Sequence, residues 1–178
     1  MPRKPVKIPG RLEKVLGILS VGAMLCAIGD IICGFFWLAY DGQRRGNGYG
    51  LWSGFLMLLP TVFGLVMLCF KSKALMAIYL LSSFISVIIA TAQFILLIIL
   101  HVHYQSLSCA PVFSEWCKCY EPGAENFDVF RMTCSMMNVL PLAMTIITGA
   151  GGSLALTGLI IGCVGSCRIK SKALARSG

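Results

Sequence analysis

The sequence is poor in charge: only 12% of its 178 residues are Asp, Glu, Lys or Arg, whereas a soluble domain has about a quarter. It contains seven acidic residues and two histidines, too few to build a catalytic site. It also lacks paired acids, a phosphate-binding loop and a His-Glu-x-x-His motif. These absences exclude a disordered chain and an ordinary cytosolic enzyme. We therefore expect no enzymatic activity, no metal and no cofactor.

Apolar residues dominate instead, at 57% of the chain. Four apolar segments are each long enough to cross a hydrocarbon core of about 30 Å, which takes roughly 20 helical residues. They cover residues 15–40, 51–70, 74–100 and 136–164. Backbone groups left without hydrogen bonds are costly in lipid, so we expect all four segments to be helices. The predicted fold class is an all-α integral membrane protein, a bundle of four transmembrane helices in contact with the lipid bilayer.

The basic residues indicate how the bundle is oriented. Eleven of the fifteen Lys and Arg residues lie in the two tails, 1–14 and 168–178, and in the short link at 71–73. Cytosolic segments are enriched in Lys and Arg, so both termini are predicted to be cytosolic. Membrane topology therefore accounts for the net charge of +8, and we expect no nucleic-acid partner. Between the tails, a transmembrane domain spans 15–167 and includes a large outer loop at 101–135.

Four of the nine cysteines lie in this outer loop: Cys109, Cys117, Cys119 and Cys134. Disulfides persist in the oxidising space outside the cytosol, and each would add roughly 2–4 kcal/mol to a loop with little core of its own. A bridge between Cys117 and Cys119 would strain the disulfide geometry. Two pairings remain open. One joins Cys109 to Cys117 and Cys119 to Cys134, and the other joins Cys109 to Cys119 and Cys117 to Cys134.

His101 and His103 lie at the outer end of the third span. Together with the Cys-Lys-Cys sequence at 117–119 they suggest a metal site, but thiols outside the cell oxidise before they coordinate a metal. A pH-sensitive patch is a second interpretation. We favour an interfacial belt, because Tyr104 and Trp116 are nearby and amphipathic rings prefer the depth of the lipid headgroups.

Three further cysteines, Cys69, Cys163 and Cys167, lie near the predicted cytosolic face. Juxtamembrane cysteines can carry reversible palmitate, although a cysteine can equally be a small packing residue. All three are candidate lipidation sites. Cys167 matches the pattern best because Arg168 follows it.

Asp30 places a formal charge inside the first span. At about 1.5 Å per residue it lies roughly 22 Å in from Val15, in the outer third of the membrane. An isolated aspartate there costs roughly 2.5–3.5 kcal/mol, so its side chain should face protein. Gln93 reaches a similar depth, and Thr145 and Thr148 are further candidate partners. An ion path or a contact with a partner helix is the functional interpretation, but with no series of acids we favour a satisfied intramembrane hydrogen bond.

Small residues on the last two spans predict close helix packing. They are Ser82, Ser86 and Ala90 on the third span, and Gly158 and Gly162 on the fourth. Packing within the bundle is the default interpretation, and a homo-oligomer face is the alternative. On the second span, Pro60 is predicted to kink the helix, with the carbonyl that it frees satisfied locally.

The chain as a whole resembles the four-span class that includes the membrane-spanning four-domain (B-lymphocyte-antigen-like) proteins and sarcospan. The residues that carry the resemblance are Gly50-Leu51-Trp52-Ser53-Gly54 at the start of the second span, His101-Val102-His103-Tyr104, Cys109, Cys117-Lys118-Cys119, and Phe130 leading to Cys134. The cysteine spacing makes the loop similar to that of sarcospan.

This resemblance implies a non-catalytic adaptor in the plasma membrane, or the sarcolemma in muscle. Such a protein is a component of a dystrophin–glycoprotein-type adhesion complex, with sarcoglycan- or dystroglycan-like partners. The first alternative is an oligomeric signalling partner of a receptor or calcium-entry channel, of the four-domain type. The second is an ion channel that uses Asp30.

Overall fold

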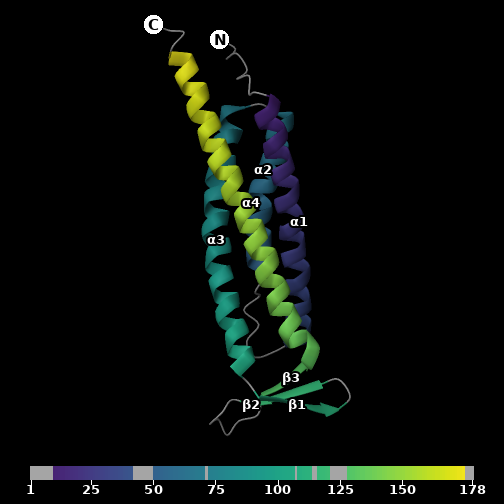
Figure 1. The fold of residues 1–178 in the computed structure, drawn as a ribbon. Coiled ribbons are helices and arrows are strands. Elements are labelled where there is room, and N and C mark those ends of the chain that lie inside the picture. Colours follow the sequence, from purple (N-terminus) through teal and green to yellow (C-terminus); the bar gives the residue numbers. More distant parts are fainter. Residues whose placement is uncertain are drawn as a thin grey trace.

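The computed structural model describes residues 10–41, 50–70, 72–106, 108–113, 116–120 and 128–174, with side chains described within 14–39, 50–105 and 139–167. Four helices form a bundle: α1 (Gly10–Asp41), α2 (Leu51–Cys69), α3 (Lys73–Ser106) and α4 (Cys134–Leu174) (Figure 1). Each is long and apolar enough to cross a membrane. The prediction of a multi-pass membrane protein with four apolar helices is therefore confirmed.

Three of the helices extend beyond their apolar segments. α1 begins at Gly10, α3 continues to Ser106, and α4 continues to Leu174. Within the described side chains, the apolar part of α4 covers Val139–Cys167 and overlaps the 136–164 expected from the sequence. The helical hydrogen-bond ladder does not require apolar side chains, so hydropathy locates the membrane segment without fixing where the helix ends.

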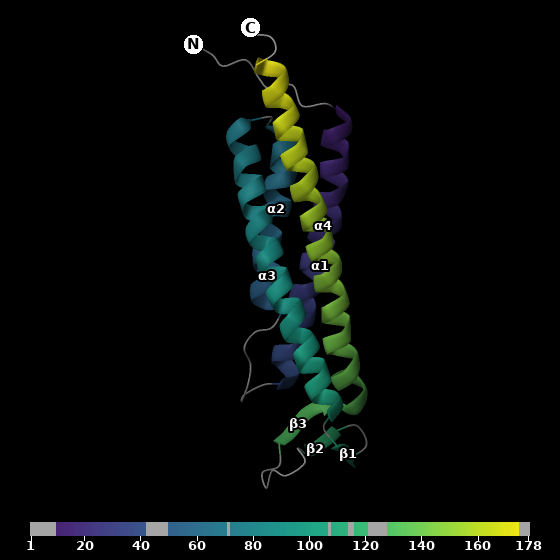
Figure 2. The same cartoon turned by 60° about the vertical axis from the view of Figure 1, so that its left-hand side comes forward.

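The segment at 101–135 that was predicted to be the outer loop contains a small antiparallel sheet, which the sequence analysis did not predict. Its strands are β1 (Ser108–Phe113), β2 (Trp116–Tyr120) and β3 (Asp128–Thr133), in the order β1-β2-β3. β3 contacts both α1 and α4. Figures 1 and 2 show the sheet at one end of the bundle, away from the start of α1 and the end of α4.

Each helix turns a narrow face of mostly small residues toward its neighbours. Apart from Gly17, the buried positions on α1 are separated alternately by four and three residues: Leu16, Ser20, Ala23, Ala27, Asp30, Gly34 and Trp37. On α3 the same steps give Tyr79, Ser83, Ser86, Ala90, Gln93 and Leu97. This heptad spacing keeps one seam of each helix against the bundle axis, and small residues on the seam let membrane helices approach closely.

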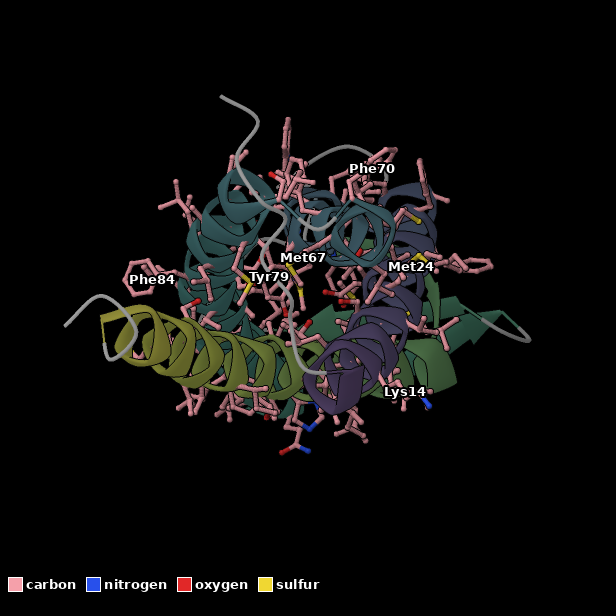
Figure 3. All side chains as sticks on the ribbon, turned by 90° about the horizontal axis from the view of Figure 1, so that it is seen from above. Lys14, Met24, Met67, Phe70, Tyr79 and Phe84 are labelled. Carbon is pink, nitrogen blue, oxygen red and sulfur yellow. The ribbon has the colours of Figure 1, made fainter. Side chains whose placement is uncertain are left out.

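Large apolar side chains cover the outside of the bundle. Ile18 on α1 is 73% exposed, and Trp52 and Phe70 at the two ends of α2 are 72% and 68% exposed. Seen along the bundle, Phe70 and Phe84 point outward, whereas Met67 and Tyr79 point between the helices (Figure 3). A surface of this kind suits lipid, where apolar exposure carries no penalty.

Candidate functional site

Asp30 is fully buried, and side chains from two other helices meet at its carboxyl group. The Thr148 hydroxyl on α4 lies 2.9 Å from both Oδ1 and Oδ2, so it donates its single proton to one or the other. The Ser53 hydroxyl on α2 lies 3.3 Å from Oδ2 and also 3.3 Å from the Gly50 carbonyl oxygen, so these two acceptors share its single proton. Both hydroxyl residues are buried as well. We call Asp30, Ser53 and Thr148 the outer polar cluster; it ties α1, α2 and α4 together.

The first turn of α2 fits closely against α1 at this level. Gly50 precedes the helix with φ of 85°, and a Cβ atom there would lie 2.7 Å from the carbonyl oxygen of Asp30. A Cβ atom on Gly54 would lie 2.9 Å from the carbonyl oxygen of Ala27. Glycine at these two positions allows the close approach that brings Ser53 to the carboxyl group. The start of a helix carries partial positive charge, which favours a carboxylate beside it.

The sequence analysis named three candidate partners for Asp30, and the structure brings one of them to it. Thr148 donates to the carboxyl group, whereas the Thr145 hydroxyl donates to the carbonyl of Pro141 in its own helix, at 2.7 Å. The Nε2 atom of Gln93 is buried and has no hydrogen-bond partner within the described part of the chain. Ser53 was missed as a partner, although it lies in the Gly-Leu-Trp-Ser-Gly stretch that carries the resemblance.

A second group of hydroxyl side chains lies nearer the other end of the bundle. Ser20 and Ser83 flank the phenol of Tyr79, and a small cavity of about 10 Å³ adjoins all three residues. Ser20 is buried, yet within the described residues its hydroxyl makes no hydrogen bond of regular geometry. We call Ser20, Tyr79 and Ser83 the inner polar cluster.

Glycines on two helices hold the Tyr79 ring in place. A Cβ atom on Gly158 of α4 would lie 2.5 Å from the Tyr79 hydroxyl oxygen, and one on Gly64 of α2 would lie 3.1 Å from the ring. A Cβ atom on Gly162, one turn further along α4, would lie 2.8 Å from Leu80. The predicted pair Gly158 and Gly162 therefore lies against α3 of the same chain.

The predicted stripe of Ser82, Ser86 and Ala90 is only partly on the buried face of α3. Ser86 and Ala90 are buried, but Ser82 is half-buried and its hydroxyl donates to the carbonyl of Tyr79, at 3.0 Å. Ser83 takes the buried position instead. A strict spacing of four drifts off the seam of a helix with 3.6 residues per turn, whereas alternating steps of four and three stay on it.

Pro60 lies inside α2 and is buried. Proline has no N–H group, so the carbonyl four residues earlier, that of Leu56, loses its helical partner. The Ser86 hydroxyl on α3 donates to this carbonyl at 3.1 Å. The sequence analysis expected local satisfaction; the partner instead comes from the neighbouring helix, because the freed carbonyl faces α3.

The candidate lipidation sites Cys69, Cys163 and Cys167 are exposed free thiols on the outside of the bundle. The side chains of Cys109, Cys117, Cys119 and Cys134 lie outside the described set, so the structure gives only the backbone positions of these residues. Among the histidines, His101 Nε2 is 3.0 Å from Gln105 Nε2. Within the described residues, no group of three or more potential metal-ligating side chains comes together.

Comparison with known proteins gives no assignment: no family model matches the chain, and neither does any curated protein sequence. The sarcospan-like resemblance therefore stays a prediction from residue patterns. The case for a function depends on the two polar clusters, the surface of the bundle and the outer loop.

Proposed function

We propose that the protein is a non-catalytic adaptor of the plasma membrane, a sarcospan-like component of a dystrophin–glycoprotein-type adhesion complex. In this proposal both tails are cytosolic and the cysteine-bearing sheet is outside the cell. The protein associates laterally with sarcoglycan- or dystroglycan-like transmembrane glycoproteins. Four observations support parts of this proposal: the closed core, the lipid-facing surface, the outer sheet and the exposed cysteines.

The observation that carries the proposal is the internal pairing of the Asp30 carboxyl group. A buried carboxyl without partners would indicate a binding or transport role, because an unpaired polar group in a membrane is costly. Here Ser53 and Thr148 of the same chain supply the hydrogen bonds. The strongest polar feature of the core therefore serves to hold the helices together, as expected for a structural component.

Apolar layers also close the bundle axis on both sides of the inner polar cluster. One layer is formed by Ala27, Met57 and Ala90, and the other by Leu16 and Met67, which pack against the Tyr79 ring. Ions cross a membrane protein along wetted polar surfaces. The apolar layers argue against a continuous ion path from Asp30 through the core, so the adaptor is favoured over the channel.

Two surfaces are then available for partners. The first is the apolar outside of the helices, which can accept a partner's transmembrane helix in place of lipid. The second is the outer sheet, whose strand β3 contacts α1 and α4 and is thereby anchored to the bundle. In the proposal, disulfides stiffen this sheet, and palmitate on the exposed cysteines Cys69, Cys163 or Cys167 strengthens membrane attachment.

The test is to identify the partners of the native protein. The tagged protein is purified from native membranes in a mild detergent, and the co-purifying proteins are identified by mass spectrometry. We expect sarcoglycan- or dystroglycan-like glycoproteins in near-stoichiometric amounts. Recovery of the protein alone, or with a receptor or calcium channel, would overturn the proposal and favour the four-domain-type alternative.

Matched variants show whether the outer loop makes the contact. Replacing Cys117 and Cys119 together by serine should remove the partners while the protein still reaches the cell surface. The control replaces Cys69 and Cys163, which lie at the other end of the bundle, and should retain the partners. The channel alternative has its own test: ion flux in reconstituted bilayers that is abolished by Asp30→Asn would contradict the adaptor.

A further inference from the structure

The strand register of the outer sheet distinguishes between the two disulfide pairings that the sequence left open. β1 and β2 are antiparallel, and Cys109 is directly opposite Cys119. Directly opposite residues in such a ladder have Cα atoms about 4.5–5.5 Å apart. This lies within the range of about 4.4–6.8 Å that a disulfide requires. The backbone thus places one pair of cysteines at bridging distance.

The register also excludes a bridge between Cys119 and Cys134. Trp116 of β2 is opposite Thr133 of β3. Cys119 lies three positions from Trp116 in one direction, and Cys134 lies one position beyond Thr133 in the other. At about 3.3 Å per residue, the two cysteines are roughly 13 Å apart along the strands, about twice the span of a disulfide. The pairing that needs this bridge cannot form.

Cys117 and Cys134 remain as the second pair. Trp116 and Thr133 are opposite each other in an antiparallel pair of strands. Cys117 lies one residue beyond Trp116 in one direction, and Cys134 lies one residue beyond Thr133 in the other direction. The two cysteines are therefore diagonal neighbours at about 7–8 Å. Cys134 is the first residue of α4 and is not held in the ladder. A small displacement of the backbone there brings the pair within bridging range. A bridge from Cys109 to Cys134 would instead have to pass over β2, which lies between β1 and β3.

We propose that the outer loop carries two disulfides, Cys109–Cys119 and Cys117–Cys134. Each forms one S–S bond as two thiols lose two protons and two electrons to the disulfide of a secretory-compartment oxidoreductase, which is reduced to its dithiol. The first disulfide locks β1 to β2, and the second locks β2 to the start of α4. The pairing rests on the proposed orientation, because only an outer loop meets this oxidant.

The sequence allows a direct test by peptide mapping. Free thiols of the purified protein are alkylated in denaturant, and the unreduced protein is digested with trypsin and a glutamate-specific protease. Cleavage after Glu115, Lys118 and Glu125 separates the first three loop cysteines, because the Glu121–Pro122 bond resists the protease, and Cys134 falls in a fourth peptide that ends at Arg168. We expect peptide 74–115 to be linked to 119–125, and peptide 116–118 to be linked to 132–168.

Each other result overturns a different part of the argument. Linkage of 74–115 to 116–118, with 119–125 linked to 132–168, would show the alternative pairing. That result would overturn the register argument but retain an oxidised outer loop. Alkylation of all four loop cysteines would overturn both the disulfides and the oxidised location on which they rest. The partner purification described above is independent of the pairing, so the two failures can be told apart.

Single variants provide a second readout that does not depend on digestion. Cys109→Ser and Cys119→Ser should each expose one additional alkylatable thiol, that of the other member of the pair, and should leave Cys117 and Cys134 protected. Cys117→Ser should instead expose Cys134. The opposite outcome, in which Cys109→Ser exposes Cys117, would overturn the proposed pairing even if some variants reach the membrane poorly.

Discussion

The two polar clusters of the core hold the bundle together in different ways. In the outer polar cluster, a carboxyl group receives hydrogen bonds from Ser53 and Thr148, and three helices are joined by these bonds. In the inner polar cluster, the Tyr79 ring packs against glycines of α2 and α4, and the Ser20 hydroxyl makes no regular hydrogen bond within the described residues. Directional bonds thus fix the helices at one level, and close packing fixes them at the other.

The difference follows from what each side chain requires. A buried carboxyl group must be paired, because leaving it without partners costs several kcal/mol. A buried serine hydroxyl has a much smaller desolvation penalty, about 1–3 kcal/mol. We therefore expect the stability of the protein to depend strongly on the partners of Asp30 and weakly on the hydroxyl of Ser20.

The largest effect should come from closing the contact that brings α2 to Asp30. Gly54→Ala places a methyl group 2.9 Å from a backbone carbonyl of α1, and backbone cannot move aside as a flexible side chain can. We expect a loss of about 2–3 kcal/mol, in the range of overpacked cores. The matched control is Gly29→Ala, whose Cβ would meet Ile147 at an ordinary 3.5 Å.

The measurement for this pair is the temperature at which the detergent-solubilised protein loses its monodisperse peak after heating. The midpoint should fall markedly for Gly54→Ala and stay near the native value for Gly29→Ala. Equal midpoints for the two variants would show that α2 does not approach α1 as closely as the structure has it.

The next effect should come from removing the strongest donor to the carboxyl group. Thr148→Val keeps the shape of the side chain and deletes the hydroxyl at 2.9 Å from Asp30. Intramembrane hydrogen bonds contribute up to about 1.7 kcal/mol, and we expect a loss near this upper limit, because the acceptor is a buried carboxyl group. The loss is measured by reversible unfolding in mixed detergent. Thr145→Val is the control, because its hydroxyl donates to the Pro141 carbonyl of its own helix, and it should lose less. Similar losses in the two variants would contradict a special role for the outer polar cluster.

A smaller effect should come from the hydrogen bond between Ser86 and the carbonyl of Leu56. Intramembrane hydrogen bonds contribute about 0.6 kcal/mol on average and up to about 1.7 kcal/mol. We expect Ser86→Ala to lose about 1 kcal/mol, since it leaves the carbonyl without a partner. In a Pro60→Ala background the helix supplies its own N–H donor, so the same substitution should then be nearly neutral. A double-mutant cycle measures this coupling, and a coupling energy of zero would contradict the assigned role of Ser86.

The sequence predicted the four helices, because hydropathy and length determine them, and it predicted that the Asp30 side chain faces protein, as its full burial confirms. It predicted Thr148 only as one of three candidates. Depth is read from residue number, but which side chain faces the carboxyl group depends on how each helix is rotated. Ser53 was missed because it belongs to the first turn of α2, and only the close approach allowed by Gly50 and Gly54 brings that turn against α1.

The outer sheet was harder to predict than the helices. Its strands have five or six residues, and Pro111 lies inside β1. Short strands interrupted by proline give a weak pattern, and their pairing depends on contacts between segments distant in sequence. The cysteines were recognised as a set, but their partners depend on the register, which the spacing in the sequence does not determine.

The smallest effect should come from the inner polar cluster. Ser20→Ala removes a buried hydroxyl whose approach to the Tyr79 phenol is not a hydrogen bond of regular geometry, so little hydrogen-bond energy is lost and a desolvated polar group is removed. We expect stability within about 0.5 kcal/mol of the native protein, in contrast to Ser53→Ala, which removes a donor to Asp30. Both are measured by the same unfolding assay. If Ser20→Ala is instead as destabilising as Ser53→Ala, the cavity of about 10 Å³ beside Tyr79 holds a bridging water. Hydrogen bonds would then hold the helices together in the inner polar cluster as they do in the outer one.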